Sequence, residues 1–259
     1  MNEWTKLSVE YARQKSYLDD LFRVYPTIPE GIRSVDEDVW EKVEWAFDRQ
    51  NNVDLINNLF KLKLFPIKDS YIAFLKRDKS AIERNPQTIN RICGRLYELG
   101  LDKLKQRCSE PKETNRQIGP MFKEWVKRKA LGIAPVDINT FCASTNNAVL
   151  DASDKVMMDF AREKLGYKRD KGLDFLARFN NKYVVGEAKF LTDFGGHQNA
   201  QLNDAISTLQ SEINATKVAI LDGVLYLKSR DKMCMCLEND YSNGAIMSAL
   251  VLREFLYQL

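Results

Sequence analysis

Apolar side chains recur every three or four positions through much of the first 130 residues, which is the spacing of one helix face. Between Trp4 and Val24 this pattern predicts a single helix that must end before Pro26. The same spacing predicts further helices over residues 36–49, 55–62, 69–76, 88–99 and 118–130. Gly100 directly follows one of them, as glycine often does at helix C-termini. We therefore expect residues 1–149 to form a largely helical region.

The pattern changes near residue 150. Asp151 or Ser153 can cap a helix that runs to Leu165. Beyond it, the pattern predicts two strands over 173–179 and 182–190, followed by a helix over 198–213. Two further strands over 217–221 and 224–228 are expected to flank a turn at Asp222-Gly223, and a last helix is expected over 242–257. This order predicts an α/β (α+β) fold, with a mixed β-sheet flanked by helices at residues 150–259.

The first two of these strands show a clean alternation of apolar and polar residues. Asn180-Asn181 lies between them, and Asn tolerates the positive φ angles of a two-residue type I′ turn. Such a turn fixes the register, so that the numbers of directly opposed residues add up to 361, as those of the turn do. Asp174 then faces Glu187, with Cβ atoms about 5 Å apart. Lys189 lies two positions further along and shares their face.

Two carboxylates that face each other repel, so a cation must lie near them. Lys189 offsets only part of the charge, whereas a divalent ion between Asp174 and Glu187 would offset it fully. Mg²⁺ held by two carboxylates can act as a Lewis acid and lower the pKa of bound water. A nearby lysine can orient the attacking water and offset phosphate charge. The pattern is therefore typical of phosphodiester hydrolysis.

Asp174 followed by Glu187-Ala188-Lys189 on the next strand resembles the PD-(D/E)XK nuclease superfamily, and most closely its type II restriction endonucleases. The resemblance covers residues 150–230 and includes the Gly-Gly and Gln that follow the second strand. It implies that Asp174, Glu187 and the Ala188 carbonyl bind Mg²⁺ and that Lys189 positions the attacking water. In this superfamily the preceding helix sometimes supplies an extra acid, for which Glu163 is the candidate.

Charge and composition refine this hypothesis. The chain has 39 Lys and Arg and 36 Asp and Glu, so its net charge is only +3, and any DNA-binding surface must come from local clusters. Residues 103–130 contain nine basic and three acidic residues, which indicates either a phosphate-contacting surface or an ordinary solvated face. The loop before residue 198 is either a DNA-contacting loop or an ordinary helix cap. The candidate DNA-binding residues are Lys127, Arg128, Lys171, His197, Gln198, Asn199 and Gln201.

Other enzyme classes fit poorly. The single His excludes His-rich zinc sites, and the five cysteines contain no CxxC pair. No signal peptide or membrane-spanning run is visible, so we expect a cytoplasmic protein that does not bind a membrane. The resemblance to restriction endonucleases implies that its source is a bacterium or archaeon.

The leading hypothesis is a Mg²⁺-dependent type II restriction endonuclease that cuts a short site in double-stranded DNA. A homodimer would fit a symmetric site, and a partner DNA methyltransferase would protect the host. The helical region at residues 1–149 would then embrace DNA, mediate dimerisation or do both. The alternatives are a repair or recombination nuclease with the same core and a non-catalytic regulator with a helix-turn-helix at residues 88–108.

Overall fold

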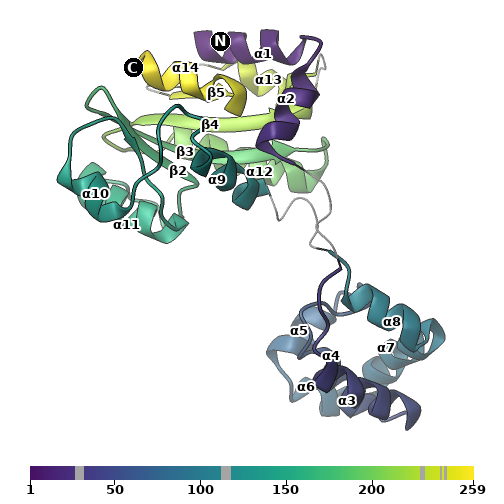
Figure 1. Cartoon of the computed structure of the whole chain (residues 1–259). Coiled ribbons are helices and arrows are strands. Elements are labelled where there is room, and N and C mark those ends of the chain that lie inside the picture. The colour runs from purple at the N-terminus through teal and green to yellow at the C-terminus, as the bar shows by residue number, and fades with distance from the viewer. Residues whose placement is uncertain (27–31, 112–117, 228–230, 240, 242–243) are drawn as a thin grey trace. The chain divides into compact units, whose positions relative to one another are not determined.

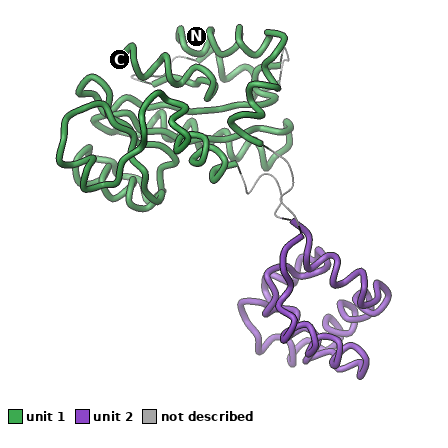
Figure 2. The backbone as a smooth tube through the Cα atoms, viewed as in Figure 1, with its two compact units in different colours: residues 1–28, 113–259 green, residues 29–112 purple. Residues whose placement is uncertain are grey.

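The computed structural model describes residues 1–26, 32–111, 118–227, 231–239, 241 and 244–259. The chain divides into two compact units (Figure 2): unit 1 contains residues 1–28 and 113–259, and unit 2 contains residues 29–112. This division differs from the expected boundary at residues 149 and 150. The reason is that the first two helices and the one that begins at Ile118 pack on the sheet of unit 1.

Unit 1 is built on one mixed sheet of five strands in sequence order, β1-β2-β3-β4-β5 (Figure 1). Its strands are β1 (Ala148–Val149), β2 (Phe175–Phe179), β3 (Lys182–Leu191), β4 (Thr216–Gly223) and β5 (Gly244–Met247). The β1–β2 and β2–β3 pairs are antiparallel, whereas β3–β4 and β4–β5 are parallel. This mixed sheet with flanking helices confirms the predicted fold class.

Helices pack against the sheet because successive strand residues point to opposite faces. Val184 of β3 belongs to the larger core of unit 1, whereas its neighbour Val185 belongs to a smaller one. The larger core includes residues of α2 (Tyr17–Val24), α9 (Ile118–Lys127), α12 (Gly196–Leu209) and α14 (Leu252–Tyr257), and partly buried residues of α1 (Glu3–Ala12) pack against it. The smaller core includes residues of α10 (Ile138–Ala143) and α11 (Asp154–Leu165). Ser153 caps α11, as its place in the sequence predicts.

The single helix predicted from Trp4 to Val24 is wrong, because the chain turns after α1 and forms α2 as a separate helix. Each helix meets a different partner. On α1, the Thr5 hydroxyl donates to the Ile246 carbonyl, and Ser8 accepts from the Ser248 amide. On α2, Tyr25 follows the last turn and bonds to Asp222. A straight helix could not satisfy both sets of contacts.

The C-terminal part corrects two further predictions. Asp222-Gly223 is not a hairpin turn, because β4 continues through it and the short 3₁₀ helix Val224–Tyr226 follows in place of a strand. Asp222 is fully buried and accepts hydrogen bonds from Ser248 and the Ala249 amide. The helix predicted over 242–257 begins only at Leu252, after β5 and the 3₁₀ helix Ala249–Val251. Residues 242–243 lie outside the described part. The remaining short helices are α13 (Lys232–Met235) and the 3₁₀ helix Cys236–Glu238.

Unit 2 is helical and has its own hydrophobic core. Its helices are α3 (Glu37–Asp48), α4 (Asn52–Leu59), α5 (Ile72–Arg77), α6 (Ala81–Arg84), α7 (Pro86–Leu99) and α8 (Leu101–Cys108). Gly100 separates the last two at a φ of +76°, which confirms its predicted place at a helix C-terminus. In the described residues, no helix of either unit combines the length and the apolar character needed to cross a membrane.

Candidate active site

The β2–β3 hairpin has the turn and register that the sequence predicts. Asn180 and Asn181 have φ angles of 48° and 61°, both in the left-handed region. Phe179 pairs with Lys182, and the ladder continues without a break to the pair of Phe175 and Gly186. The predicted two-residue turn and its register are therefore confirmed over the whole of β2.

Asp174 lies one residue before β2, where the regular ladder ends. Its amide donates to the Gly186 carbonyl at 3.2 Å. Its carboxylate oxygen Oδ2 accepts from the Ala188 amide at 3.0 Å, in the place that a backbone carbonyl would take in a longer ladder. The Asp174 side chain thus turns toward β3 and lies next to the Glu187-Ala188-Lys189 segment.

Lys189 bridges the two carboxylates. Its Nζ lies 2.5 Å from Asp174 Oδ2 and 3.0 Å from Glu187 Oε2. Because one nitrogen reaches both oxygens at those two distances, the oxygens are no more than about 5.5 Å apart. The structure therefore brings together the three residues that the sequence singles out, on one edge of the hairpin.

A second lysine, Lys171, joins this cluster from the loop between α11 and β2. Its Nζ lies 2.9 Å from Glu187 Oε2 and also forms an ion pair with Asp204 on α12. Lys171 was predicted to contact DNA, but its side chain is mostly buried among these acids. Asp204 was not predicted from the sequence, because no spacing rule shows which turn of α12 faces that loop. The cluster thus alternates acids and lysines.

The electrostatics of the cluster shift the pKa values of its two acids in opposite directions. Burial, followed by repulsion from Asp174, raises the pKa of Glu187 to about 7, although Lys189 and Lys171 oppose the shift. Burial also acts to raise the pKa of Asp174, but the charge and hydrogen bond of Lys189 together with the Ala188 amide lower it overall. For Lys189, burial acts to lower the pKa, but the two carboxylates outweigh it and raise the pKa. Lys189 is therefore a cation at neutral pH.

One oxygen of Glu187 suits a further cation. Glu187 is only 1 % exposed, and among the described residues no group hydrogen-bonds to its Oε1. A buried carboxylate oxygen without a partner is costly, so it indicates a missing ligand. In the described residues no group of three His, Cys, Asp or Glu side chains is placed to hold a metal. A backbone carbonyl such as that of Ala188 would have to complete the donor set, and oxygen donors of this kind fit a hard divalent ion.

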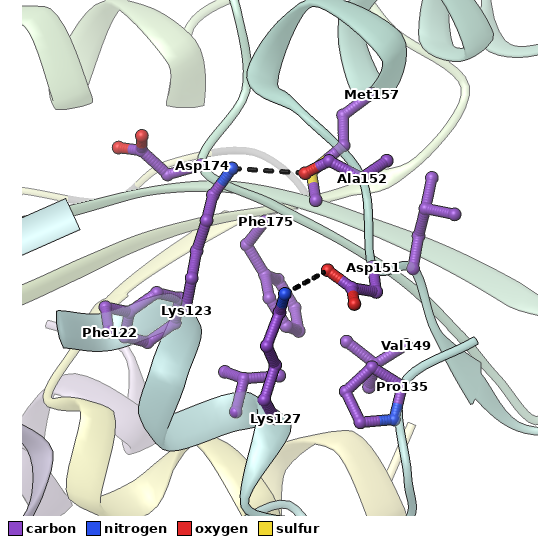
Figure 3. A pocket seen from close by; sticks show the side chains of 12 residues that line it. Phe122, Lys123, Lys127, Pro135, Val149, Asp151, Ala152, Met157, Asp174 and Phe175 are labelled. Atoms are coloured by element: carbon purple, nitrogen blue, oxygen red, sulfur yellow. Dashed lines mark hydrogen bonds and ion pairs between the residues drawn. The ribbon is translucent and has the colours of Figure 1, made fainter. Parts of the chain in front are cut away.

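A small pocket lies beside Asp174, and two lysines of α9 line it (Figure 3). Lys123 and Lys127 are one helical turn apart. Lys123 Nζ bonds to Asp154 at 2.5 Å and to the Ala152 carbonyl at 3.2 Å, and Lys127 Nζ lies 3.2 Å from Asp151. Lys127, a predicted DNA-binding residue, and Lys123 thus line the same pocket as Asp174.

The other candidate residues are more dispersed. Gln198 is buried, and its amide bonds to Thr192 within the loop, so it is occupied in holding that loop. Asn199 donates to the Phe194 carbonyl, while His197 is exposed at the start of α12 and Gln201 is half-buried. Arg128 and Glu163 are exposed and pair with their helix neighbours Glu124 and Lys164. Glu163 therefore makes no described contact with the carboxylate cluster.

The basic run at residues 103–130 is not one surface. Its first part lies on α8 in unit 2, and its last part lies on α9 in unit 1. Residues 112–117 between them lie outside the described residues. A single basic face therefore cannot be assigned to the run.

The family model of the Tsp45I type II restriction enzyme matches residues 2–259, nearly the whole chain. The chain belongs to this family. It is accordingly a sequence-specific DNA endonuclease, and type II restriction enzymes generally use a divalent metal. The match includes unit 2 as well as the sheet, and it gives no support to the alternatives of a repair nuclease or a regulator. Comparison with curated proteins and with solved structures gave no match.

Proposed function

We propose that Asp174, Glu187 and Lys189 form the catalytic centre of this restriction enzyme and that its metal is Mg²⁺, as in the PD-(D/E)XK nucleases. The observation that carries the proposal is the bridge of Lys189 between two buried carboxylates that the hairpin register places together. The orphaned Glu187 Oε1 supports a cation next to it. Oxygen-only ligands favour Mg²⁺ over softer metals.

Each residue has a distinct part in hydrolysis. Asp174, Glu187 and the Ala188 carbonyl would hold the ion, which supplies Lewis-acid stabilisation of the phosphate charge and lowers the pKa of water. Lys189 remains cationic. Its two carboxylate partners leave one N–H free to donate to the attacking water, and its charge offsets that of the phosphate. Water adds to phosphorus and gives up a proton to solvent, the bond from phosphorus to the leaving sugar oxygen breaks, and that oxygen takes up a proton from solvent. Lys171 pairs both with Glu187 and with Asp204 of α12, and so it holds Glu187 in place.

DNA contacts and assembly complete the proposal. Lys127 at the end of α9, Arg128 directly after it, and the exposed His197 and half-buried Gln201 on α12 would contact phosphates or base edges. The enzyme works as a homodimer, because two-fold symmetry matches a symmetric DNA site. A DNA methyltransferase protects the host DNA, and both proteins act in the cytoplasm of a bacterium or archaeon, where that DNA lies.

The test is cleavage of plasmid DNA by the purified protein, with Mg²⁺ or with excess EDTA, followed by sequencing of the ends. Asp174→Asn and Lys189→Ala should lose cleavage, whereas Glu163→Gln, a matched change of an exposed acid, should cut as the wild type does. Cleavage at the normal rate by Asp174→Asn would contradict the proposed centre. Full cleavage in EDTA would contradict the metal.

A further inference from the structure

Charge in unit 2 is divided between two stretches of sequence. Residues 36–54, which form α3 and the start of α4, contain seven acidic and two basic residues. Residues 61–95, which contain α5, α6 and most of α7, have nine basic and three acidic residues. A solvated surface of mixed charge does not require such a separation. The basic stretch is therefore a candidate for contact with an anionic partner.

Two of the three acids within the basic stretch pair with arginines. Asp69 pairs with Arg91 at 2.6 Å, and Asp78 pairs with Arg84 at 2.6 Å. The hydrogen bond from Arg91 lowers the pKa of Asp69, which keeps it ionised and paired at neutral pH. In the described part of the chain, Arg77 and Arg95 have no ion-pair partner. Positive charge is thus left over for an external anion.

Aromatic side chains lie among these arginines. Tyr71 is 58 % exposed and Phe74 is 61 % exposed. Tyr71, Phe74 and Arg77 follow each other at intervals of three residues, so they lie on one face at α5. The Arg91 guanidinium lies 5.6 Å from the centre of the Tyr71 ring, and Arg95 follows one turn later on α7. These five residues form what we call the α5–α7 patch.

The five residues of the patch lie outside the hydrophobic core of unit 2. The core of the unit takes Leu75 from α5 and Ile92 and Leu96 from α7, which lie on the inner faces of these helices. Large aromatic side chains that remain exposed beside unpaired arginines leave apolar area in water, and this combination is typical of binding surfaces. The charge of the patch selects an anionic partner.

We propose that the α5–α7 patch of unit 2 binds duplex DNA, with its arginines on phosphates and its aromatic rings on sugars and base edges. This inference rests on the proposed function, because the partner is the DNA that the enzyme cuts. Phosphates attract Arg77 and Arg95 and are repelled by the acids of α3, so the charges favour the patch over α3 as the part of unit 2 that meets DNA.

The experiment measures DNA affinity against salt for the full chain. Wild-type protein and the double variant Arg77→Gln/Arg95→Gln are titrated onto a mixed-sequence duplex in EDTA, where no cleavage occurs. The loss of two phosphate contacts should reduce the slope of log K against log salt by about 2. If the two contacts contribute nothing near ~1 M salt, this difference in slope means that the double variant binds DNA about 30-fold more weakly than the wild type at ~0.15 M salt.

Two further variants isolate the cause. Lys42→Gln/Arg49→Gln removes the same charge from two exposed positions in the acidic stretch at α3 and should bind as the wild type does. Phe74→Ala should weaken binding without changing the slope, because a neutral ring releases no counterions. The charge-preserving variant Arg77→Lys/Arg95→Lys should keep the wild-type slope. Thermal unfolding checks that each variant folds.

The results separate this inference from the proposed function. If wild-type protein cuts and binds DNA but Arg77→Gln/Arg95→Gln keeps the same affinity and slope, the patch does not bind DNA. If that variant loses self-association in light scattering while its DNA affinity is unchanged, the patch is an interface between copies, and the inference is also overturned. If Asp174→Asn cuts normally while the patch variant binds weakly, only the catalytic assignment fails.

Discussion

Replacing Glu187 with Gln should stabilise the protein and abolish cleavage at the same time. The side chain is 1 % exposed, and burial and Asp174 raise its pKa from 4.5 to about 7. At pH 8 Glu187 is ionised in both the folded and the unfolded chain. A difference of about 2.5 pKa units then means that the ionised side chain costs about 3 kcal/mol of folding free energy. Gln has the same shape without the charge, so it removes this cost.

The stabilising effect of Glu187→Gln should grow as the pH rises. Because the folded pKa is raised, the folded protein holds a proton between about pH 4.5 and 7 that the unfolded chain has released. Wild-type stability from this group is therefore fully present below pH 4.5 and is lost as the pH rises through 7. The advantage of Glu187→Gln should be below about 1 kcal/mol near pH 5 and should reach its full size at pH 8.

The assay is thermal unfolding of both proteins in EDTA at pH 5 and pH 8. For a unit of this size, about 3 kcal/mol raises Tm by roughly 6–12 °C at pH 8. The control is Glu163→Gln, an exposed acid on α11, whose Tm should follow the wild type at both pH values. If Glu187→Gln melts at or below the wild-type temperature at pH 8, the reasoning from desolvation and carboxylate repulsion is refuted.

Three other changes test the cluster and its support. Ca²⁺ should allow specific DNA binding with little cutting in a gel-shift and cleavage assay, because its looser coordination suits the acids but not the reaction; rapid cutting in Ca²⁺ would contradict this. Lys171→Met should bind Ca²⁺ about tenfold more tightly in calorimetry, since a cation 2.9 Å from Glu187 is lost; weaker binding would show that Lys171 is needed to position the ligand. Tyr25→Phe should lower the free energy of unfolding by about 1–2 kcal/mol in urea, because it removes a buried donor to Asp222; an unchanged midpoint would refute that estimate.

The amino-acid sequence by itself determines the hairpin and the residues on its active edge. Alternation of apolar and polar side chains defines β2 and β3, and two Asn residues with positive φ angles define the turn between them. Both signals are local, because a strand repeats every two residues and a two-residue turn fixes the register. The convergence of Asp174, Glu187 and Lys189 follows from that register. The start of α11 is also determined by a local signal, the Ser153 side chain that caps the helix.

Only the tertiary structure decides which distant residues join the hairpin. Lys171 and Asp204 meet Glu187 because α12 crosses between two parallel strands, and no spacing in the sequence shows which turn of that helix faces the cluster. The sequence Asp222-Gly223 is typical of a turn. In the structure Asp222 accepts hydrogen bonds from Tyr25 and Ser248 on two other segments, and because these bonds satisfy its carboxylate, Asp222 can lie in a buried strand. The packing of α1, α2 and α9 on the sheet likewise depends on contacts between residues far apart in the chain, which periodicity cannot encode.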